Sequence, residues 1–150
     1  MENSVSNPQA WIFFADKDLA LAEFIAERPE FTGELSFHCQ QSIEKYLKAY
    51  LSKYKIPLKK THDLVELYHT AKGIKDWEID EILLKDIRDL YVEIRYPSNI
   101  GLLTDGTLPT QEKAKIYLDF AKKIASIVKS ELEKLQQLET EKQNLKIGEQ

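Results

Sequence analysis

The stretch that decides the fold is FHCQQSIEKYLKAYLSKYKIPLKK, residues Phe37–Lys60. Its apolar residues recur at steps of three and four, which places them on one face of an α-helix. These residues are Cys39, Ile43, Tyr46, Leu47, Tyr50 and Tyr54. Polar side chains fall to the side or outside of that face, namely His38, Gln41, Lys45 and Lys48. The stretch therefore predicts a helix with an apolar core stripe and a polar edge.

The limits of this helix follow from its flanking residues. It begins after Thr32–Gly33 and ends near Tyr54, because Ile56 precedes Pro57 and is pushed out of the helical region. About 22 residues at 1.5 Å each give a length of roughly 33 Å. A helix of this length sets the length of a bundle.

The same periodicity predicts a helix on the N-terminal side, capped by Asn7, with Pro8 in its first turn and Pro29 as its stop. Its expected buried stripe is Trp11, Phe14, Ala15, Ala22, Ile25 and Ala26. Asp18 points into that stripe, where a carboxylate needs a partner. We favour a partly buried aspartate bonded to a neighbouring helix over an acidic member of a functional site.

Three further helices follow on the C-terminal side. A short one runs from near Thr61 to Gly73, with His62 in its first turn, and a longer one runs from residue 76 or 77 to Arg95. The last begins at a Thr110 cap and ends near residue 138. Residues 96–109 form a long connection of the kind that is often functional.

These elements predict an all-α fold, an antiparallel up-and-down bundle of four main helices plus one short helix. We expect one domain over residues 1–138 and a charged, disordered tail over residues 139–150. With 150 residues and 43% hydrophobic content the chain needs no disulfide or structural metal. The single Cys39 suits a buried position in a reducing compartment, and no segment resembles a signal peptide or a membrane span. We therefore expect a cytoplasmic protein without a membrane partner.

The net charge of −4 argues against a protein that coats nucleic acid with its whole surface. Six lysines between Lys45 and Lys60 could provide a local basic patch, or simply a solvated face. In an up-and-down bundle the end of the central helix, the turn Lys59–Lys60–Thr61–His62–Asp63 and the exit Arg95–Tyr96–Pro97 would meet at one end.

Such a meeting of lysines, a histidine and an arginine would suit a phosphate, with free N–H groups after Asp63 as further donors. Arg88 lies seven residues before Arg95, on the same side of its helix. The alternative has equal weight: His62 and Asp63 cap a helix, and Arg95 neutralises a helix C-terminus.

Catalytic signals are few. The three histidines and one cysteine lack zinc spacing, and glycine-rich phosphate loops are absent, so we expect no metal and no cofactor. A histidine and an arginine can cleave a phosphate ester without metal, which leaves Arg95 and His62 as catalytic candidates.

Four motifs together resemble the HEPN domain, named for higher eukaryotes and prokaryotes nucleotide-binding. They are AxxDLxxA with Asp18, FHCQQSIEKYLKAYL over residues 37–51, THDL over 61–64 and RYP over 95–97. The resemblance spans roughly Gln9 to Leu135. His38, Gln41, Glu44 and Lys45 carry it within the central helix.

The resemblance implies a helical bundle that often dimerises, and a partnership with a small nucleotidyltransferase in toxin–antitoxin modules. Many members are metal-independent ribonucleases, marked by an arginine followed after four to six residues by a histidine. Here Ile100, Gly101 and Leu102 follow Arg95 at those distances, and no histidine follows Arg88 there either. The chain is therefore similar to a subgroup with an RYP motif and without the ribonuclease motif.

Three functions stay open. The first is an accessory module that homodimerises, partners a nucleotidyltransferase and binds nucleotide or RNA phosphate through Arg95, Tyr96, Lys59, Lys60, His62 and Arg88. The second is a toxin ribonuclease that uses Arg95 with His62. The third is a helical scaffold whose exposed polar edge, His38–Gln41–Lys45, is an interface.

Overall fold

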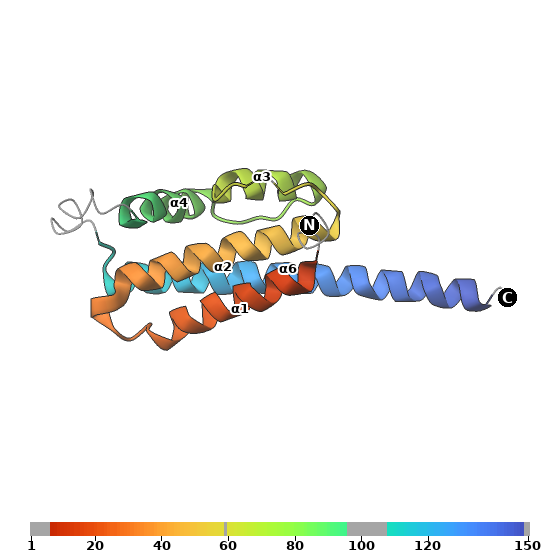
Figure 1. Ribbon diagram of the computed structural model, residues 1–150, viewed down its shortest axis with the longest axis horizontal. Helices are drawn as coiled ribbons and strands as arrows, with labels where there is room; N and C mark the ends of the chain where they lie inside the picture. The colour runs from red at the N-terminus through yellow and green to blue at the C-terminus, as the bar shows by residue number, and fades with distance from the viewer. Residues whose placement is uncertain (1–6, 59, 96–107, 149–150) are drawn as a thin grey trace.

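The computed structural model describes residues 7–58, 60–95 and 108–148, with only the backbone described for residues 91–95. Its helices are α1 (Pro8–Phe24), the 3-10 turn η2 (Pro29–Phe31), α2 (Thr32–Lys53), α3 (Leu64–Ile74), α4 (Glu81–Arg95) and α6 (Gln111–Gly148). No strand occurs among the described residues. The prediction of an all-α bundle of four main helices plus a short one is confirmed (Figure 1).

Helix α2 is the central element of the bundle. It begins at Thr32, slightly ahead of the predicted start after Thr32–Gly33, and its 22 residues end at Lys53, next to the predicted end at Tyr54. The predicted stripe from Cys39 to Tyr50 is buried, whereas Tyr54 at the helix end is 39% exposed. Polar residues of α2 are buried as well, including Gln40, Glu44 and Lys48, because other helices cover α2 on several sides. The expectation that Lys48 lies outside the core was wrong.

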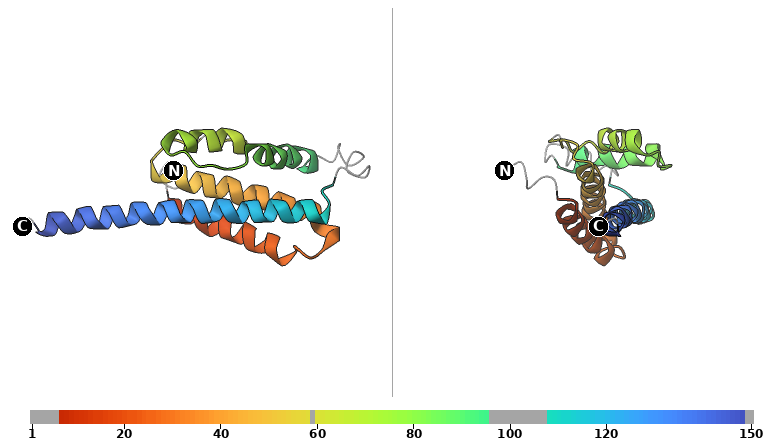
Figure 2. Two further views of the ribbon diagram at one scale, coloured as in Figure 1. Left: turned by 180° about the vertical axis from the view of Figure 1, so that it is seen from behind. Right: turned by 90° about the vertical axis from the view of Figure 1, so that its right-hand side faces the viewer.

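Helices α1 and α6 pack against α2 and are joined to each other by a row of ion pairs. Helix α6 presents Lys115, Lys122 and Lys129 at seven-residue steps, and their partners on α1 and just after it are Glu27, Glu23 and Asp16. As the residue numbers of these lysines rise along α6, the residue numbers of their acidic partners fall, so the two helices are antiparallel. Figure 2 shows α6 running on past the other helices.

Helices α3 and α4 lie over α2, one near each of its ends (Figure 1). The connection after α2 turns back along it, because Gln40 Nε2 donates to the His62 carbonyl oxygen at 3.4 Å, near the middle of α2. Helix α3 then runs in the same direction as α2. Helix α4 returns and ends at the end of the bundle where α2 begins. The predicted meeting of the end of α2 with Arg95 was therefore wrong.

Helix caps were predicted well at two positions. The Asn7 side chain accepts from the Gln9 and Ala10 N–H groups, and Thr110 Oγ1 accepts from Lys113 N–H at 3.1 Å. The start of α4 was predicted too early. Asp80 caps it by accepting from Leu83 N–H at 3.1 Å. The preceding Trp77 is buried in a connection instead, edge-on to Tyr50 with 4.4 Å between ring centroids.

Two expectations about the outer helices need correction. Helix α1 ends at Phe24, ahead of Pro29, and Phe14 is 54% exposed although the sequence placed it in the buried stripe. Residues 139–148, expected to be a disordered tail, continue α6 as an exposed helix, in which Glu139 bonds to Lys53 of α2 at 2.7 Å. Good helix formers such as Glu, Lys, Gln and Leu dominate that segment, which accounts for its helicity without core contacts.

Candidate functional site

The candidate site centres on a buried carboxylate beneath an exposed imidazole. Glu44 on α2 is 5% exposed, and its Oε1 accepts a hydrogen bond from His62 Nδ1 at 2.8 Å. The His62 side chain is 55% exposed. Since one ring nitrogen is held by the carboxylate, the orientation of the ring is fixed at the surface.

The surroundings of Glu44 are polar and enclosed. Lys48, one turn further along α2, places its Nζ 3.4 Å from Glu44 Oε2 and 5.4 Å from the centre of the Trp11 ring. Gln40, one turn before, is buried and accepts from Gln41 Nε2 at 2.9 Å. The ammonium group of Lys48 therefore partners the carboxylate that holds His62, while Gln40 bonds to the His62 backbone.

Arg88 from α4 reaches the same surface. Its NH1 group lies 3.5 Å from Asp63 Oδ1, and its Nε lies 3.0 Å from Asp89 Oδ1. The hydrogen bond to Asp89, with the charges of Asp89 and Asp63, raises the pKa of the Arg88 guanidinium above its ordinary value. The structure thus brings Arg88 into contact with Asp63, the residue that follows His62 in the chain, and both His62 and Arg88 are predicted site residues.

Asp63 itself caps α3. Its Oδ1 accepts from the N–H groups of Val65 and Glu66, at 3.0 and 3.2 Å. The N–H groups that were expected to be available to a phosphate are therefore occupied. His62 lies just before the cap rather than in the first turn of α3. The capping alternative is correct for Asp63, while His62 bonds to α2.

The structure says less about the positions of the other predicted phosphate ligands. Lys60 is exposed two residues before His62. Arg95 is the last residue of α4, seven residues beyond Arg88, and its side chain lies outside the described residues, as do Lys59 and Tyr96. Two turns of helix span roughly 10 Å, so Arg95 follows Arg88 along the same side of α4.

The remaining family-motif residues form a second polar cluster, between α1 and α2. Asp18 is 14% exposed and accepts from His38 Nδ1 at 3.0 Å and from Lys45 Nζ at 2.5 Å. The interpretation of Asp18 as a partly buried carboxylate bonded to a neighbouring helix is confirmed. The polar edge His38–Gln41–Lys45 is partly buried, and all three residues bond within the chain, so it is not the exposed surface that the scaffold hypothesis assumed.

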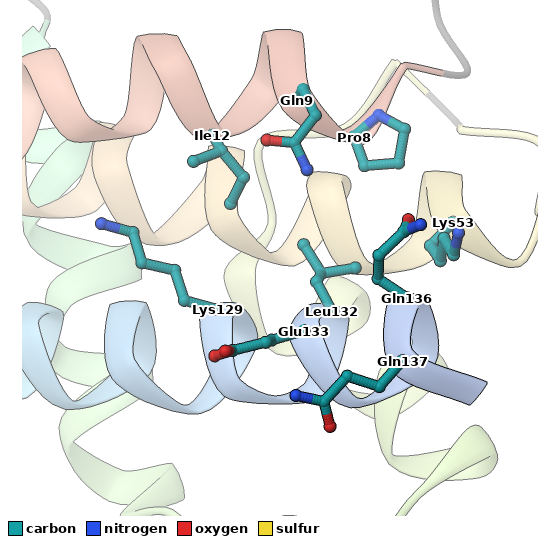
Figure 3. A pocket seen from close by; sticks show the side chains of 9 residues that line it. All are labelled: Pro8, Gln9, Ile12, Lys53, Lys129, Leu132, Glu133, Gln136 and Gln137. Carbon is teal, nitrogen blue, oxygen red and sulfur yellow. The ribbon is translucent and has the colours of Figure 1, made fainter. Parts of the chain in front are cut away.

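Two hollows of the surface have apolar side chains in their lining. One of about 270 Å³ adjoins the turn before α3 and is lined by residues that include Leu51, Ile56, Thr61 and Glu66. The other, of about 600 Å³, opens between the start of α1 and α6, with Ile12 and Leu132 among its lining residues (Figure 3). None of the residues that line the larger hollow belongs to the site around His62.

Sequence reasoning missed the residues that hold His62 in place. Glu44 was noted only for its family likeness, and Gln40 not at all. Gln40, Glu44 and Lys48 follow one another at four-residue steps, which places them on one face of α2. What could not be read from the sequence is that the segment carrying His62 turns back over that face.

Two classes of site receive no support from the described residues. No group of three or more His, Cys, Asp or Glu side chains there could hold a metal ion. None of the described helices is long and apolar enough to cross a membrane. The polar groups around the candidate site are the His62 imidazole, the Arg88 guanidinium and the Lys60 ammonium group, together with the carboxylates of Asp63 and Asp89.

Comparison with known proteins agrees with this architecture. No curated protein matches the sequence. Two solved structures share the fold at 22% sequence identity: TT1696 from Thermus thermophilus, with a TM-score of 0.61 over 87% of this chain and 98% of that one, and ST0689, an archaeal HEPN homologue, with a TM-score of 0.60 over 83% and 97%. The model of the HEPN domain matches residues 8–132, which include the helices and turns that carry both polar clusters. The chain therefore belongs to the HEPN domain family.

Proposed function

We propose that this HEPN domain binds a nucleotide or an RNA phosphate on the surface formed by His62, Lys60 and Arg88, and that Arg95 extends this surface along α4. In this account the domain is an accessory binding module that works beside a small nucleotidyltransferase. The proposal does not require it to be an enzyme.

One observation carries the proposal. The buried Glu44 fixes the exposed His62 ring. Arg88, 26 residues after His62, contacts Asp63, which is the residue next to His62. Burying a carboxylate and an ammonium group is costly in free energy. A fold that meets this cost in order to orient one surface ring is well suited to positioning a ligand.

Arg88 is the natural phosphate ligand, because a guanidinium presents a planar fork of donors that matches phosphate oxygens. It now bonds to two carboxylates, Asp63 and Asp89, and is 26% exposed. A phosphate would replace one of these contacts. Since the whole chain carries a charge of −4, we expect binding to be local and moderate rather than a general affinity for nucleic acid.

The test is a titration of nucleotides and short single-stranded RNA by fluorescence anisotropy at two salt concentrations. With about three phosphate contacts the logarithm of the binding constant should fall against the logarithm of salt with a slope of about −2. Arg88→Ala and His62→Ala should each weaken binding by at least about tenfold. Lys85→Ala, an exposed cation on the same helix, is the matched control and should have little effect. Absence of binding to both ligands would remove the proposal.

A second candidate is a metal-independent ribonuclease. The observation that favours it is the same contact, because a histidine oriented by a carboxylate is a common form of general acid or base. Arg88 or Arg95 would then stabilise the charge that develops on the phosphate.

Cleavage of RNA in the presence of a chelator would support this candidate. His62→Ala should abolish the cleavage, and Glu44→Gln should reduce it while leaving RNA binding nearly unchanged. His69→Ala is a matched control, since His69 is 60% exposed and bonds to Glu81 at 2.6 Å. RNA that stays intact during prolonged incubation with pure protein would exclude the ribonuclease.

For the nucleotidyltransferase partner we propose the outer face of α1. Four large apolar side chains are exposed there, Phe13, Phe14, Leu21 and Phe24, the last at 85%. Clusters of this kind mark protein contacts more often than bare surface. Phe24→Glu should abolish co-purification with the nucleotidyltransferase, and Glu34→Lys, at an exposed position near the start of α2, should not.

A further inference from the structure

Helix α6 extends beyond the bundle as an exposed arm. Leu132 is its last buried residue, and every residue from Gln136 to Gly148 is exposed. At 1.5 Å per residue the helix continues for about 24 Å past Leu132. Figures 1 and 2 show this blue segment projecting past the ends of α1 and α2. The arm also lies beyond the residues that the family model matches, which end at 132.

The arm carries a heptad pattern. Leu135, Leu138, Lys142 and Leu145 follow one another at steps of three, four and three, which places them on one side of the helix as positions a, d, a and d. Leu138 is 53% exposed and Leu145 is 69% exposed. No other helix in the described part of the chain buries these two leucines, so packing them against a partner helix would stabilise the arm.

The charges beside this side are complementary to those of a second copy. In a parallel pair of helices, position g of one helix faces the next position e of the other. The g positions here are Lys134 and Glu141, and the following e positions are Glu139 and Lys146. Lys134 would thus face Glu139 of a second copy, and Glu141 would face its Lys146. Both contacts join opposite charges, and twofold symmetry repeats each of them. Within one copy Glu139 bonds to Lys53 Nζ at 2.7 Å and Lys134 lies 3.5 Å from Glu131 Oε1, so pairing would exchange these two contacts for the one between Lys134 and Glu139 of different copies.

Leucine at both d positions and a lysine at one a position favour the same arrangement. Leucine at d suits two parallel strands, and a polar residue at a single a position fixes register at some cost in stability. In register, Lys142 lies beside its own counterpart near the end of the arm, where its ammonium group can reach solvent.

We propose that the α6 arms of two copies pair in parallel as a short two-stranded coiled coil, and that this contact holds the homodimer. The proposal adds to the phosphate site and does not depend on it; it rests only on the expectation that the protein dimerises. Because two heptads bury little surface, we expect a dimer whose dissociation is measurable by dilution.

The test is sedimentation of the full chain across a concentration series. Leu138→Glu with Leu145→Glu should raise the dimer dissociation constant by at least about tenfold. Gln137→Glu with Asn144→Glu adds the same charge at the same spacing on another side of the arm and should leave the dimer intact. Glu141→Lys should weaken the dimer, and adding Lys146→Glu should restore it.

Orientation is tested by a single cysteine on the arm. Leu145→Cys should give a disulfide-linked dimer on mild oxidation, since equivalent d positions meet in a parallel pair, whereas Asn144→Cys should not. The native Cys39 is fully buried and does not interfere.

Each contrary result has a distinct meaning. A wild-type chain that stays monomeric at every concentration overturns both the arm pairing and the expectation of a homodimer. A dimer unaffected by the leucine changes overturns the arm pairing alone. A dimer that depends on the leucines but gives no Leu145→Cys cross-link overturns the parallel arrangement.

Discussion

Glu44 Oε1 lies 2.8 Å from His62 Nδ1, so a hydrogen bond joins the middle of α2 to the turn that precedes α3. The carboxylate is buried and the imidazole is exposed. This contact links the core of the bundle to its candidate ligand surface. Loss of Glu44 is therefore expected to affect both stability and function.

Glu44→Ala should lower the free energy of unfolding by about 3 kcal/mol, because it leaves the buried Lys48 ammonium without its carboxylate. Urea unfolding followed by circular dichroism measures the change. Glu44→Leu combined with Lys48→Met removes both charges and should recover most of the loss. Glu133→Ala on exposed α6 should change stability by less than about 0.5 kcal/mol. Equal urea midpoints for Glu44→Ala and the wild type would contradict this description of the pair.

Asp18→Ala should cost about 2 kcal/mol, because it removes the acceptor of two partly buried donors, His38 and Lys45. Asp18→Asn should cost less, since the amide oxygen can still accept from one of them. Thermal unfolding of the two variants gives the comparison, with the exposed Lys17→Ala as control. If both Asp18 variants matched the control, the α1–α2 cluster would be irrelevant to stability.

The Cys39 thiol should be inert in the folded protein. Burial raises its pKa to about 12, although the charge of Lys122 acts in the opposite direction. Since the thiolate is the reactive form, a thiol reagent near pH 8 should label Cys39 only as fast as the protein unfolds. Adding denaturant should accelerate labelling in step with the loss of helical signal. Complete labelling of native protein within seconds would show that Cys39 is accessible.

Glu131 should contribute a pH-dependent part of the stability. Burial alone would raise the pKa of its carboxyl, but the hydrogen bond and charge of Lys75 and the charge of Lys134 outweigh burial and lower the pKa. A group with a lower pKa when folded stabilises above its unfolded pKa, and that contribution is lost as pH falls through the folded pKa. Glu131→Gln should therefore reduce the difference in unfolding free energy between about pH 7 and about pH 3. An unchanged difference, equal to that of the control Glu133→Gln, would refute the prediction.

The fold was largely predictable because its signals are local. The apolar period defined α2, and the caps at Asn7 and Thr110 were read from residue type alone. The direction of α3 was predicted wrongly, because the connection of about ten residues between α2 and α3 was expected to turn at the end of the bundle. Ile56 and Leu58 in this connection pack against the core, so the chain runs back along α2 before α3 begins.

The candidate site was predictable only in part. His62 and Arg88 were proposed from residue type and family likeness, and in the structure Arg88 contacts Asp63, the residue that follows His62. Arg95 was expected beside them. Because α4 runs away from the turn before α3, Arg95 lies about two helical turns further from that turn than Arg88 does. The pairing of Glu44 with His62 depends on the path of that connection, and periodicity carries no information about it.

The most direct test of the phosphate site is to follow the imidazole resonances by nuclear magnetic resonance while a nucleotide or short RNA is added. The chain has three histidines, which serve as ligand probe and internal controls. His62 should shift in a saturable way, and the shift should be lost in Arg88→Ala. His69, equally exposed and also bonded to a glutamate, and His38 beside Asp18 should hardly move. A His62 resonance that does not shift on addition of ligand, or equal shifts of His62 and His69, would contradict the proposal that this surface binds phosphate.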